Sequence, residues 1–292
     1  MSKVNLIKKM YRNVLRILPM KSALNLIFFR GYRKILDLNN PKYWGEKIQW
    51  LKLYGNLDEL AAFVDKYEVR EFISQSIGEE YLNQLYGVYD NVDDIEFDKL
   101  PEKFVLKNTN GSSAVLICKD KKKFNIKSAK KIMKKWLKDD YFKEKKEPQY
   151  KYVKNRIIIE KYLEDETGSL TDYKFYCFDG KVFCYGIFYD RYVDKSIDFY
   201  DSKGNKLTNV NTCHIKNSNK VEKFDKRIQD MISLSEKLSK NFSEVRVDFY
   251  YVNGHIYFGE LTFTDGAGSD PWYPVEFDLE IASKIKLEKV RR

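Results

Sequence analysis

Two acidic residues, Asp248 and Glu260, lie inside the apolar and aromatic stretch RVDFYYVNGHIYFGELTF. Neighbouring carboxylates on a partly buried face repel each other unless a cation lies between them. Mg²⁺ binds one or two carboxylates together with substrate phosphates, so such a pair is typical of a magnesium site. The alternative is that one acid faces solvent while the other pairs with a lysine.

The turn between these acids decides whether they share a face. β-Branched and aromatic residues on both sides of Asn253-Gly254 predict a β-hairpin. A two-residue turn would pair Asp248 with Gly259 and leave Glu260 on the opposite face. A three-residue loop over 252–254 would instead pair Asp248 with Phe258, and Asp248, Phe258 and Glu260 would then share one face.

A second candidate site is FVLKNTNGSS, in which a predicted strand ends near Lys107 and enters a polar loop that contains Gly111. Backbone N–H groups and hydroxyls in such a loop can hold phosphates while the lysine supplies positive charge. The Walker A pattern is absent, and an ordinary hairpin turn is the alternative interpretation.

The segment IIIEKYL predicts a buried strand that ends at Glu160. Backbone groups after such a strand can bind the edge of an adenine, whereas the simpler interpretation pairs Glu160 with a nearby lysine. Lys174 and Arg191 belong to the hairpin region that follows, where both are also compatible with plain surface charges.

The elements that must position these residues follow from the rest of the chain. Its 292 residues suffice for two domains or one large one, and 43% hydrophobic with 33% charged residues is typical of a globular protein. Helical patterns come first, followed by mixed strands and helices with adjacent hairpins. This order predicts an α+β fold with antiparallel sheets.

The net charge of +10 indicates an anionic partner without choosing among nucleotide, acidic glycan, anionic lipid and nucleic acid. The basic and amphipathic segment 3–34 predicts either contact with an anionic membrane surface or a helix packed on its own domain. We expect no nucleic-acid partner, because the strands lack an RNA-recognition signature and no groove-reading helix motif is present.

The cysteines and histidines limit which kinds of metal site and catalysis the chain can have. Cys118, Cys177, Cys184 and Cys213 show neither CxxC nor metal-ligand spacing, which predicts free thiols in a reducing compartment. No secretory signal and no apolar run of about 20 residues is found, so we expect a cytoplasmic protein. Two histidines in the whole chain argue against histidine-dependent nucleophilic catalysis.

The order of the segments resembles the ATP-grasp superfamily and, more closely, the TupA-like ATP-grasp family, which is found with bacterial surface-polysaccharide biosynthesis. The resemblance runs from about Asn40 to Leu287 and is carried by NPKYWGEKIQWLKLY, VDKYEVREF, LPEKFVLKNTNGSS, IIIEKYL, DYKFYCFDGKV, VDFYYVNG and ELTFTDGAGSDPW. It implies two α+β lobes with antiparallel sheets that grip ATP. The expected divisions are a basic N-terminal segment 1–39, a helical region 40–100, a small lobe 101–163 and a large lobe 164–292.

The resemblance also implies roles for the matching positions. Residues expected to bind ATP are Arg70, Lys107, Thr109, Gly111, Ser112, Ser113, Glu160, Lys161 and Leu163. Lys174 and Arg191 are the expected catalytic cations, and Asp248, Glu260 and Thr262 the expected Mg²⁺ ligands, the three-residue loop bringing the two acids onto one face. The superfamily usually has Asn where this chain has Thr262, so a weaker or water-mediated metal contact is expected there.

The function implied is an ATP-dependent carboxylate–amine ligase that works through an acyl phosphate. Its expected substrates are an acidic sugar or amino acid and an amino acid or amino sugar, with a lipid-linked glycan as one form, at the inner face of the cytoplasmic membrane. The segment GAGSDPW is expected to border the acceptor site. One alternative is a kinase or glycosyl-transfer enzyme that acts on a surface glycan. Another is a non-catalytic basic module that binds membranes or polyanions.

Overall fold

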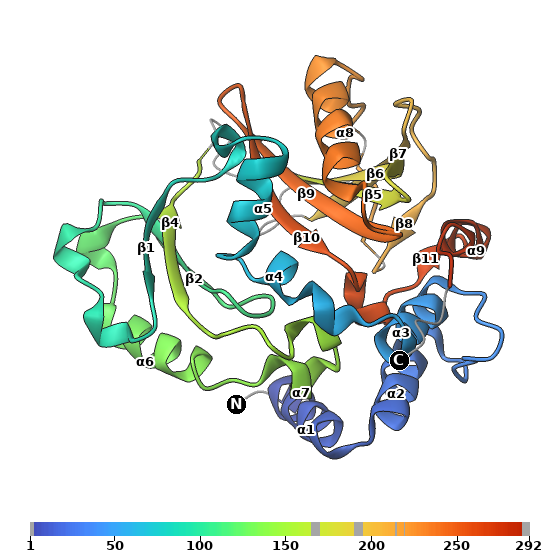
Figure 1. Cartoon of the computed structure of the whole chain (residues 1–292), viewed down its shortest axis with the longest axis horizontal. Helices are drawn as coiled ribbons and strands as arrows, with labels where there is room; N and C mark the ends of the chain where they lie inside the picture. Colours follow the sequence, from blue (N-terminus) through green and yellow to red (C-terminus); the bar gives the residue numbers. More distant parts are fainter. Residues whose placement is uncertain (1–2, 165–169, 190–194, 214, 219, 288–292) are drawn as a thin grey trace.

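The computed structural model describes residues 3–164, 170–189, 195–213, 215–218 and 220–287. Within these ranges the chain forms two lobes, each built on an antiparallel sheet, and a helical N-terminal region packed against them (Figure 1). None of the described helices is both long and apolar enough to cross a membrane.

The N-terminal region consists of α1 (Lys3–Ile17), α2 (Met20–Tyr32) and α3 (Trp44–Tyr54). Leu15 of α1 is buried in one cluster with Ala23 and Leu24 of α2. The third helix begins at Trp44, because the side chain of Glu46 accepts hydrogen bonds from the N–H of Lys42 (2.7 Å) and the N–H of Tyr43 (3.1 Å).

The four-stranded sheet, called here the small sheet, has the order β1-β4-β2-β3. Its strands are β1 (Leu85–Tyr89), β2 (Phe104–Asn108), β3 (Val115–Cys118) and β4 (Ile157–Lys161). Phe104, Leu106, Ile157 and Ile159 belong to a buried cluster with Ala129 and Met133 of α6 (Ile126–Trp136). Since strand side chains alternate, Lys107 and Glu160 extend from the opposite face.

The five-stranded sheet, called here the large sheet, has the order β10-β9-β5-β6-β7. Its strands are β5 (Asp172–Phe178), β6 (Lys181–Tyr189), β7 (Ser196–Asp201), β9 (Glu244–Val252) and β10 (His255–Thr262). Phe175, Val247 and Phe249 pack in one buried cluster with Met231 of α8 (Lys226–Ser239). Alternation therefore places Lys174 and Asp248, which pair directly across β5 and β9, on the other face.

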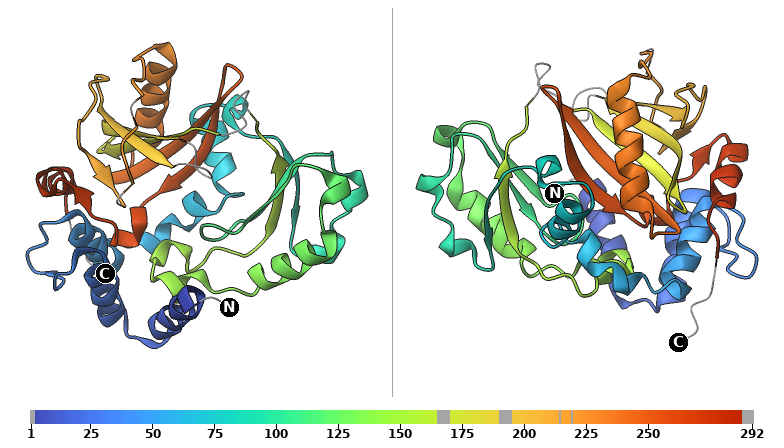
Figure 2. Two further views of the ribbon diagram at one scale, coloured as in Figure 1. Left: turned by 180° about the vertical axis from the view of Figure 1, so that it is seen from behind. Right: turned by 45° about the horizontal axis from the view of Figure 1, so that its top comes forward.

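Shorter elements complete the two lobes and the connections between them (Figure 2). They are α4 (Ala61–Val64), α5 (Val69–Ser76), α7 (Tyr141–Lys145), β8 (Asn211–Thr212), β11 (Trp272–Tyr273), α9 (Val275–Ser283) and the 3₁₀ turns at 57–60, 79–81, 92–94, 97–99, 121–123, 148–150 and 265–268. The turn at 265–268 is held close to the N-terminal region: a Cβ on Gly31 of α2 would lie 1.6 Å from the carbonyl oxygen of Ser269.

Candidate functional site

The hairpin of β9 and β10 brings Asp248 and Glu260 together by a route that the sequence did not predict. Asn253 and Gly254 form a two-residue turn with φ of 51° and 83°, and Val252 pairs with His255. The expected three-residue loop is therefore wrong. A β-bulge between Phe258 and Glu260 leaves Gly259 unpaired and places Glu260 directly opposite Asp248.

The bulge also corrects the expected position of Phe258. This side chain pairs with Phe249 and is buried in the core of the large lobe, so it does not share a face with the two acids. A Cβ on Gly259 would lie 3.0 Å from the carbonyl oxygen of Asp248, which leaves little room for a larger residue at the bulge.

A cation lies between the two carboxylates, and it is Arg246. Its Nε and Nη2 donate to Asp248 at 2.7 and 2.8 Å, and Nη2 also donates to Glu260 at 2.8 Å. Nη1 donates to Asp265, and Lys174 donates to the second oxygen of Asp248. We call Lys174, Arg246, Asp248, Glu260 and Asp265 the ion-pair cluster.

The charges of this cluster depend on one another. Burial by itself would raise the pKa of Asp248, but the neighbouring Arg246 and Lys174 outweigh it and hold the pKa below its usual value. Burial would lower the pKa of Arg246, and Asp248 and Asp265 instead raise it well above the ordinary value. Asp248 is therefore a carboxylate and Arg246 a cation throughout the neutral range.

By itself, the ion-pair cluster supplies only some of the ligands that a bound Mg²⁺ needs. Both oxygens of Asp248 already accept from cations, whereas the side chain of Glu260 is 45% exposed. Thr262 donates to Glu260 at 3.0 Å and accepts from Arg246 at 3.1 Å. Within the described ranges no three His, Cys, Asp or Glu side chains are arranged to hold a metal ion. An all-oxygen pair of acids suits Mg²⁺ when phosphates supply the remaining ligands.

A second group of charges extends from the small sheet. Lys107 of β2 contacts Glu160 of β4 at 2.5 Å, and Arg70 of α5 lies 3.5 Å from the other oxygen of Glu160. We call Arg70, Lys107 and Glu160 the hinge cluster. Glu160 therefore pairs with a lysine, as the simpler interpretation predicted. Two cations, Lys107 and Arg70, lie next to its carboxylate.

The loop after β2 has a buried base and an exposed end. The hydroxyl of Thr109 donates to the carbonyl of Lys154 at 2.7 Å and accepts from the N–H of Arg156 at 3.0 Å, so both its hydrogen-bonding roles are taken by backbone groups. Ser112 and Ser113 are exposed at the end of the loop. Thr109 thus anchors the loop, and the two serines are the hydroxyls that it presents.

Tyr141 of α7 supports the exposed end of this loop. Its hydroxyl lies 2.9 Å from that of Ser112, and a Cβ on Gly111, where φ is +76°, would lie 2.3 Å from the Tyr141 ring. Glycine suits both requirements, because a side chain here would strain the left-handed backbone and would also clash with the ring.

Lys66 connects the two clusters and was not among the predicted site residues. Its backbone N–H donates to the carbonyl of Thr109 at 3.3 Å, and its ammonium donates to the carbonyl of Gly111. Burial lowers its pKa, and the charges of Glu260 and Glu160 oppose this shift. Lys66 and Glu260 also line one small cavity of about 10 Å³. Lys66 therefore lies where the large sheet and the loop of the small sheet meet.

The backbone after β4 was predicted to bind adenine, and part of it already has partners. The N–H of Lys161 donates to the carbonyl of Gln84 at 2.9 Å, and its carbonyl accepts from the side chain of Asn83 at 2.9 Å. Leu163 is buried.

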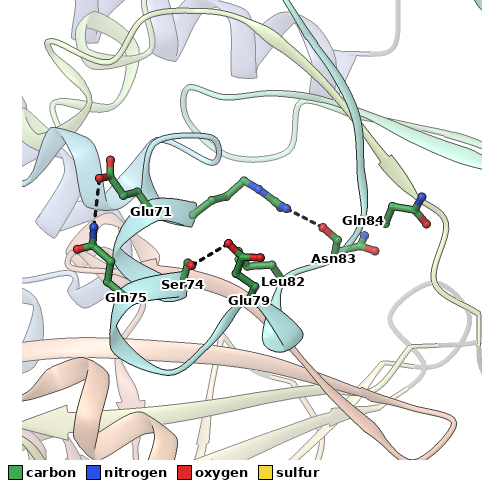
Figure 3. A pocket seen from close by; sticks show the side chains of 8 residues that line it. Glu71, Ser74, Gln75, Glu79, Leu82, Asn83 and Gln84 are labelled. Atoms are coloured by element: carbon green, nitrogen blue, oxygen red, sulfur yellow. Dashed lines mark hydrogen bonds between the residues drawn. The ribbon is translucent and has the colours of Figure 1, made fainter.

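A larger cavity of about 490 Å³ lies beside this segment, between α5 and residues 82–84 (Figure 3). Arg70 borders it and donates to the carbonyl of Asn83 at 2.8 Å. Of the predicted site residues, Arg70 alone belongs to its described lining, which also contains Glu71, Ser74, Gln75, Glu79, Leu82 and Gln84.

A further polar network lies next to the ion-pair cluster. Thr264 donates to the buried carboxylate of Glu147 and accepts from Gln149 at 2.6 Å. Lys52 of α3 donates to the carbonyl of Ala267 at 2.7 Å, and burial lowers its pKa to about 8. The segment GAGSDPW, predicted to border an acceptor site, is thus contacted by a buried lysine.

Sequence reasoning missed Lys66, Arg246 and Glu147. A signal existed for Arg246, because it precedes Asp248 by two residues and so shares its face. The pairing of Glu147 with Thr264 joins residues 117 positions apart and leaves no local signal. Arg191, predicted to be catalytic, lies outside the described residues.

A model of the TupA-like ATPgrasp family matches residues 46–286 of the chain. No curated protein matches this chain. Similar solved structures include the D-alanine–D-alanine ligase of Helicobacter pylori, with 13% identity, a TM-score of 0.44 and a match covering 86% of this chain and 68% of that one.

Two other similar structures are the ATP-grasp ligase PsnB complexed with a minimal precursor, Mg and ADP, and N5-carboxyaminoimidazole ribonucleotide synthetase (purK) in its ADP complex. For PsnB the identity is 10%, the TM-score 0.42, and the match covers 82% of this chain and 66% of that one. For the synthetase the identity is 13%, the TM-score 0.42, and the match covers 70% of this chain and 46% of that one, so this chain spans less than half its length.

Proposed function

The chain belongs to the TupA-like ATP-grasp family, and we propose that it uses ATP to join a carboxylate to an amine through an acyl phosphate. Membership confirms the predicted family and, with the two antiparallel sheets, the predicted α+β ATP-grasp fold. An ATP-grasp ligase is the class of enzyme that this family indicates. The observation that supports the proposal most is the position of Lys66, which shares a cavity with Glu260 of the ion-pair cluster and donates to Gly111 in the loop after β2.

The triphosphate would lie along the cations contributed by the small sheet and its neighbours. Lys107 and Arg70 both pair with Glu160, and Lys66 lies close enough to feel the charges of Glu260 and Glu160, so three cations are gathered where phosphate oxygens would bind. The exposed Ser112 and Ser113, with the backbone around Gly111, would cover the phosphates. Adenine would lie beside Glu160, Lys161 and Leu163, with backbone groups that follow Lys161 facing it, because the N–H and carbonyl of Lys161 already have partners.

Magnesium would be held at the ion-pair cluster. Glu260, with its exposed side chain, and Asp248 would supply carboxylate oxygens, and Thr262 would contribute its hydroxyl directly or through water. The ion would neutralise charge on the transferred phosphoryl group. Lys174 and Arg246, both held by Asp248, would face the oxygens of the phosphate and of the substrate carboxylate. For Arg191, which lies outside the described residues, the proposed catalytic role rests on the family resemblance alone.

The reaction needs no covalent enzyme nucleophile. The substrate carboxylate would attack the γ-phosphate and release ADP, and the amine would then attack the acyl carbon and release phosphate, leaving an amide. The chain's contribution is orientation and fixed positive charge, and these account for much of the catalysis in phosphoryl transfer.

We propose substrates from bacterial surface-polysaccharide assembly: an acidic sugar or amino acid as the carboxylate, and an amino acid or amino sugar as the amine. The family predicted from the sequence supports this choice. A lipid-linked glycan as acceptor would require the enzyme to work at a membrane surface.

Calorimetric titration of ATP with Mg²⁺ tests the nucleotide site. We expect the wild type to bind and Lys107→Ala and Glu260→Ala to lose at least about tenfold in affinity, the loss of a charge-assisted contact. Lys103→Ala is the matched control, because Lys103 lies just before the same strand and pairs with Glu164. Equal affinity in all four proteins would contradict the assignment.

A second assay tests the chemistry. Candidate carboxylates are supplied with ATP and hydroxylamine, which traps an acyl phosphate as a hydroxamate. Hydroxamate formation together with ADP is the result expected of a ligase. Release of ADP with a stable phosphorylated product would instead identify a kinase.

A further inference from the structure

Helix α1 carries an apolar line that the rest of the described chain does not cover. Ile7, Met10, Val14 and Ile17 are 65%, 60%, 41% and 82% exposed. Their spacing of three, four and three residues places them along one side of the helix. We call these four residues the α1 stripe.

The helix is held in place by a different side. Leu15 is 2% exposed and packs with Leu24 and Ile27 of α2, while Tyr11 and Leu18 lie partly buried beside them. The structure separates an inward side from the outward stripe, so the stripe is exposed on a helix whose orientation is fixed.

The charged residues of the N-terminal segment that carries the stripe have one sign. Residues 1–36 contain nine lysines and arginines and no aspartate or glutamate. Arg12 and Arg16 are exposed on α1 itself, and Arg16 reaches Glu144 of α7. A helix with an apolar side, a basic polar side and no acid is typical of segments that lie in the interface of an anionic bilayer.

We propose that the α1 stripe inserts into the surface of an anionic lipid membrane, with the surrounding lysines and arginines held by the lipid headgroups. Each such cation near an anionic surface adds attraction, and apolar side chains add burial. A second copy of the chain fits less well, because pairing two stripes would bring two segments of nine cations together. The apolar α1 stripe would not contribute to binding a nucleic acid.

Docking there would set the orientation of the enzyme. Helices α1 and α7 lie side by side at the lower edge of the molecule in Figure 1. Tyr141 of α7 contacts Gly111 and Ser112, so only α7 separates α1 from the loop after β2. This inference is independent of the ligase chemistry, because it rests on α1 alone.

The test is co-sedimentation of the full chain with vesicles of phosphatidylcholine, with and without phosphatidylglycerol. The wild type is expected to bind the anionic vesicles and not the neutral ones. Ile7→Glu with Ile17→Glu should lower the affinity for anionic vesicles at least about tenfold, because two exposed apolar side chains are lost. Val221→Glu with Val275→Glu is the matched control, since it changes two exposed valines and the same charge elsewhere.

Three results would overturn the proposal. One is unchanged binding of the stripe variant to anionic vesicles, and another is equal binding of the wild type to neutral ones. The third is self-association of the wild type in sedimentation velocity that the stripe variant abolishes, which would make a second copy the occupant. Circular dichroism of both variants checks that α1 still forms.

Discussion

Asp248 and Glu260 face each other across β9 and β10 because one residue, Gly259, is left out of the ladder. Without this bulge the two-residue turn would pair Asp248 with Gly259 and send Glu260 to the core side. The extra residue restores the shared face, and Arg246 occupies the space between the two acids. The arrangement of the ion-pair cluster thus depends on one irregularity in one strand.

Arg246→Met should make stability depend on divalent cations. It removes the cation shared by Asp248, Glu260 and Asp265, and breaking a buried ion pair in this way costs about 3–5 kcal/mol. Urea unfolding with and without Mg²⁺ measures the effect, and Mg²⁺ should stabilise the variant more than the wild type. Arg12→Met, at an exposed position, is the control. An equal response to Mg²⁺ in all three proteins would argue against metal binding by these acids.

Gly111→Ala should cost more than Gly254→Ala. Both positions have a positive φ, +76° and +83°, so both variants incur backbone strain of about 1–2 kcal/mol. A Cβ at Gly111 also meets the Tyr141 ring at 2.3 Å, whereas nothing lies within 4 Å at Gly254. We expect an additional loss of about 1–3 kcal/mol for the first variant.

Urea unfolding compares these two glycine variants, and calorimetry compares their affinities for ATP. Only Gly111→Ala should weaken ATP binding, because only that loop is proposed to cover the phosphates. Equal stability of the two variants would mean that the Tyr141 contact contributes nothing.

Lys52 should make stability rise with pH. Its pKa falls from 10.5 to about 8 on folding, so the folded state releases this proton at lower pH than the unfolded state does. Stability from this group therefore increases as pH rises from about 8 towards 10.5, by about 2 kcal/mol between pH 7 and pH 9.5. Lys52→Met should lack this increase, and the exposed Lys127→Met should retain it. Parallel pH profiles for all three proteins would contradict the shift.

Thr264→Val should destabilise the fold more than Thr262→Val. The hydroxyl of Thr264 is buried and joins Glu147 to Gln149, so its loss leaves a buried carboxylate and a buried amide each without one partner. Such losses cost about 1–3 kcal/mol. Thr262 is only partly buried, and Arg246 and Glu260 still pair without it. Chemical unfolding measures the loss of unfolding free energy in each variant. A smaller loss for Thr264→Val than for Thr262→Val would show that the network around Thr264 does not stabilise the fold.

The sequence by itself determined most of the elements and which candidate residues share a face within one strand. Asn253-Gly254 marked the position of the hairpin, and alternating apolar residues marked the two strands around it, but the length of the turn was not predicted correctly. The same alternation turns Lys107 and Glu160 each away from the apolar cluster under its own strand, and it puts Arg246 on the same face as Asp248. These are local rules, which depend only on residues within one strand or one turn.

Tertiary structure alone decided the register and the long-range partners. The bulge at Gly259 arises from the fit between β10 and its neighbour, which the pattern of either strand does not specify. Lys66 meets Glu260 and the loop at Gly111, and Glu147 meets Thr264, because separate elements pack together. The sequence shows which charged residues are present and how they are spaced. Which of them become neighbours is determined by the sum of many weak packing contacts between separate elements.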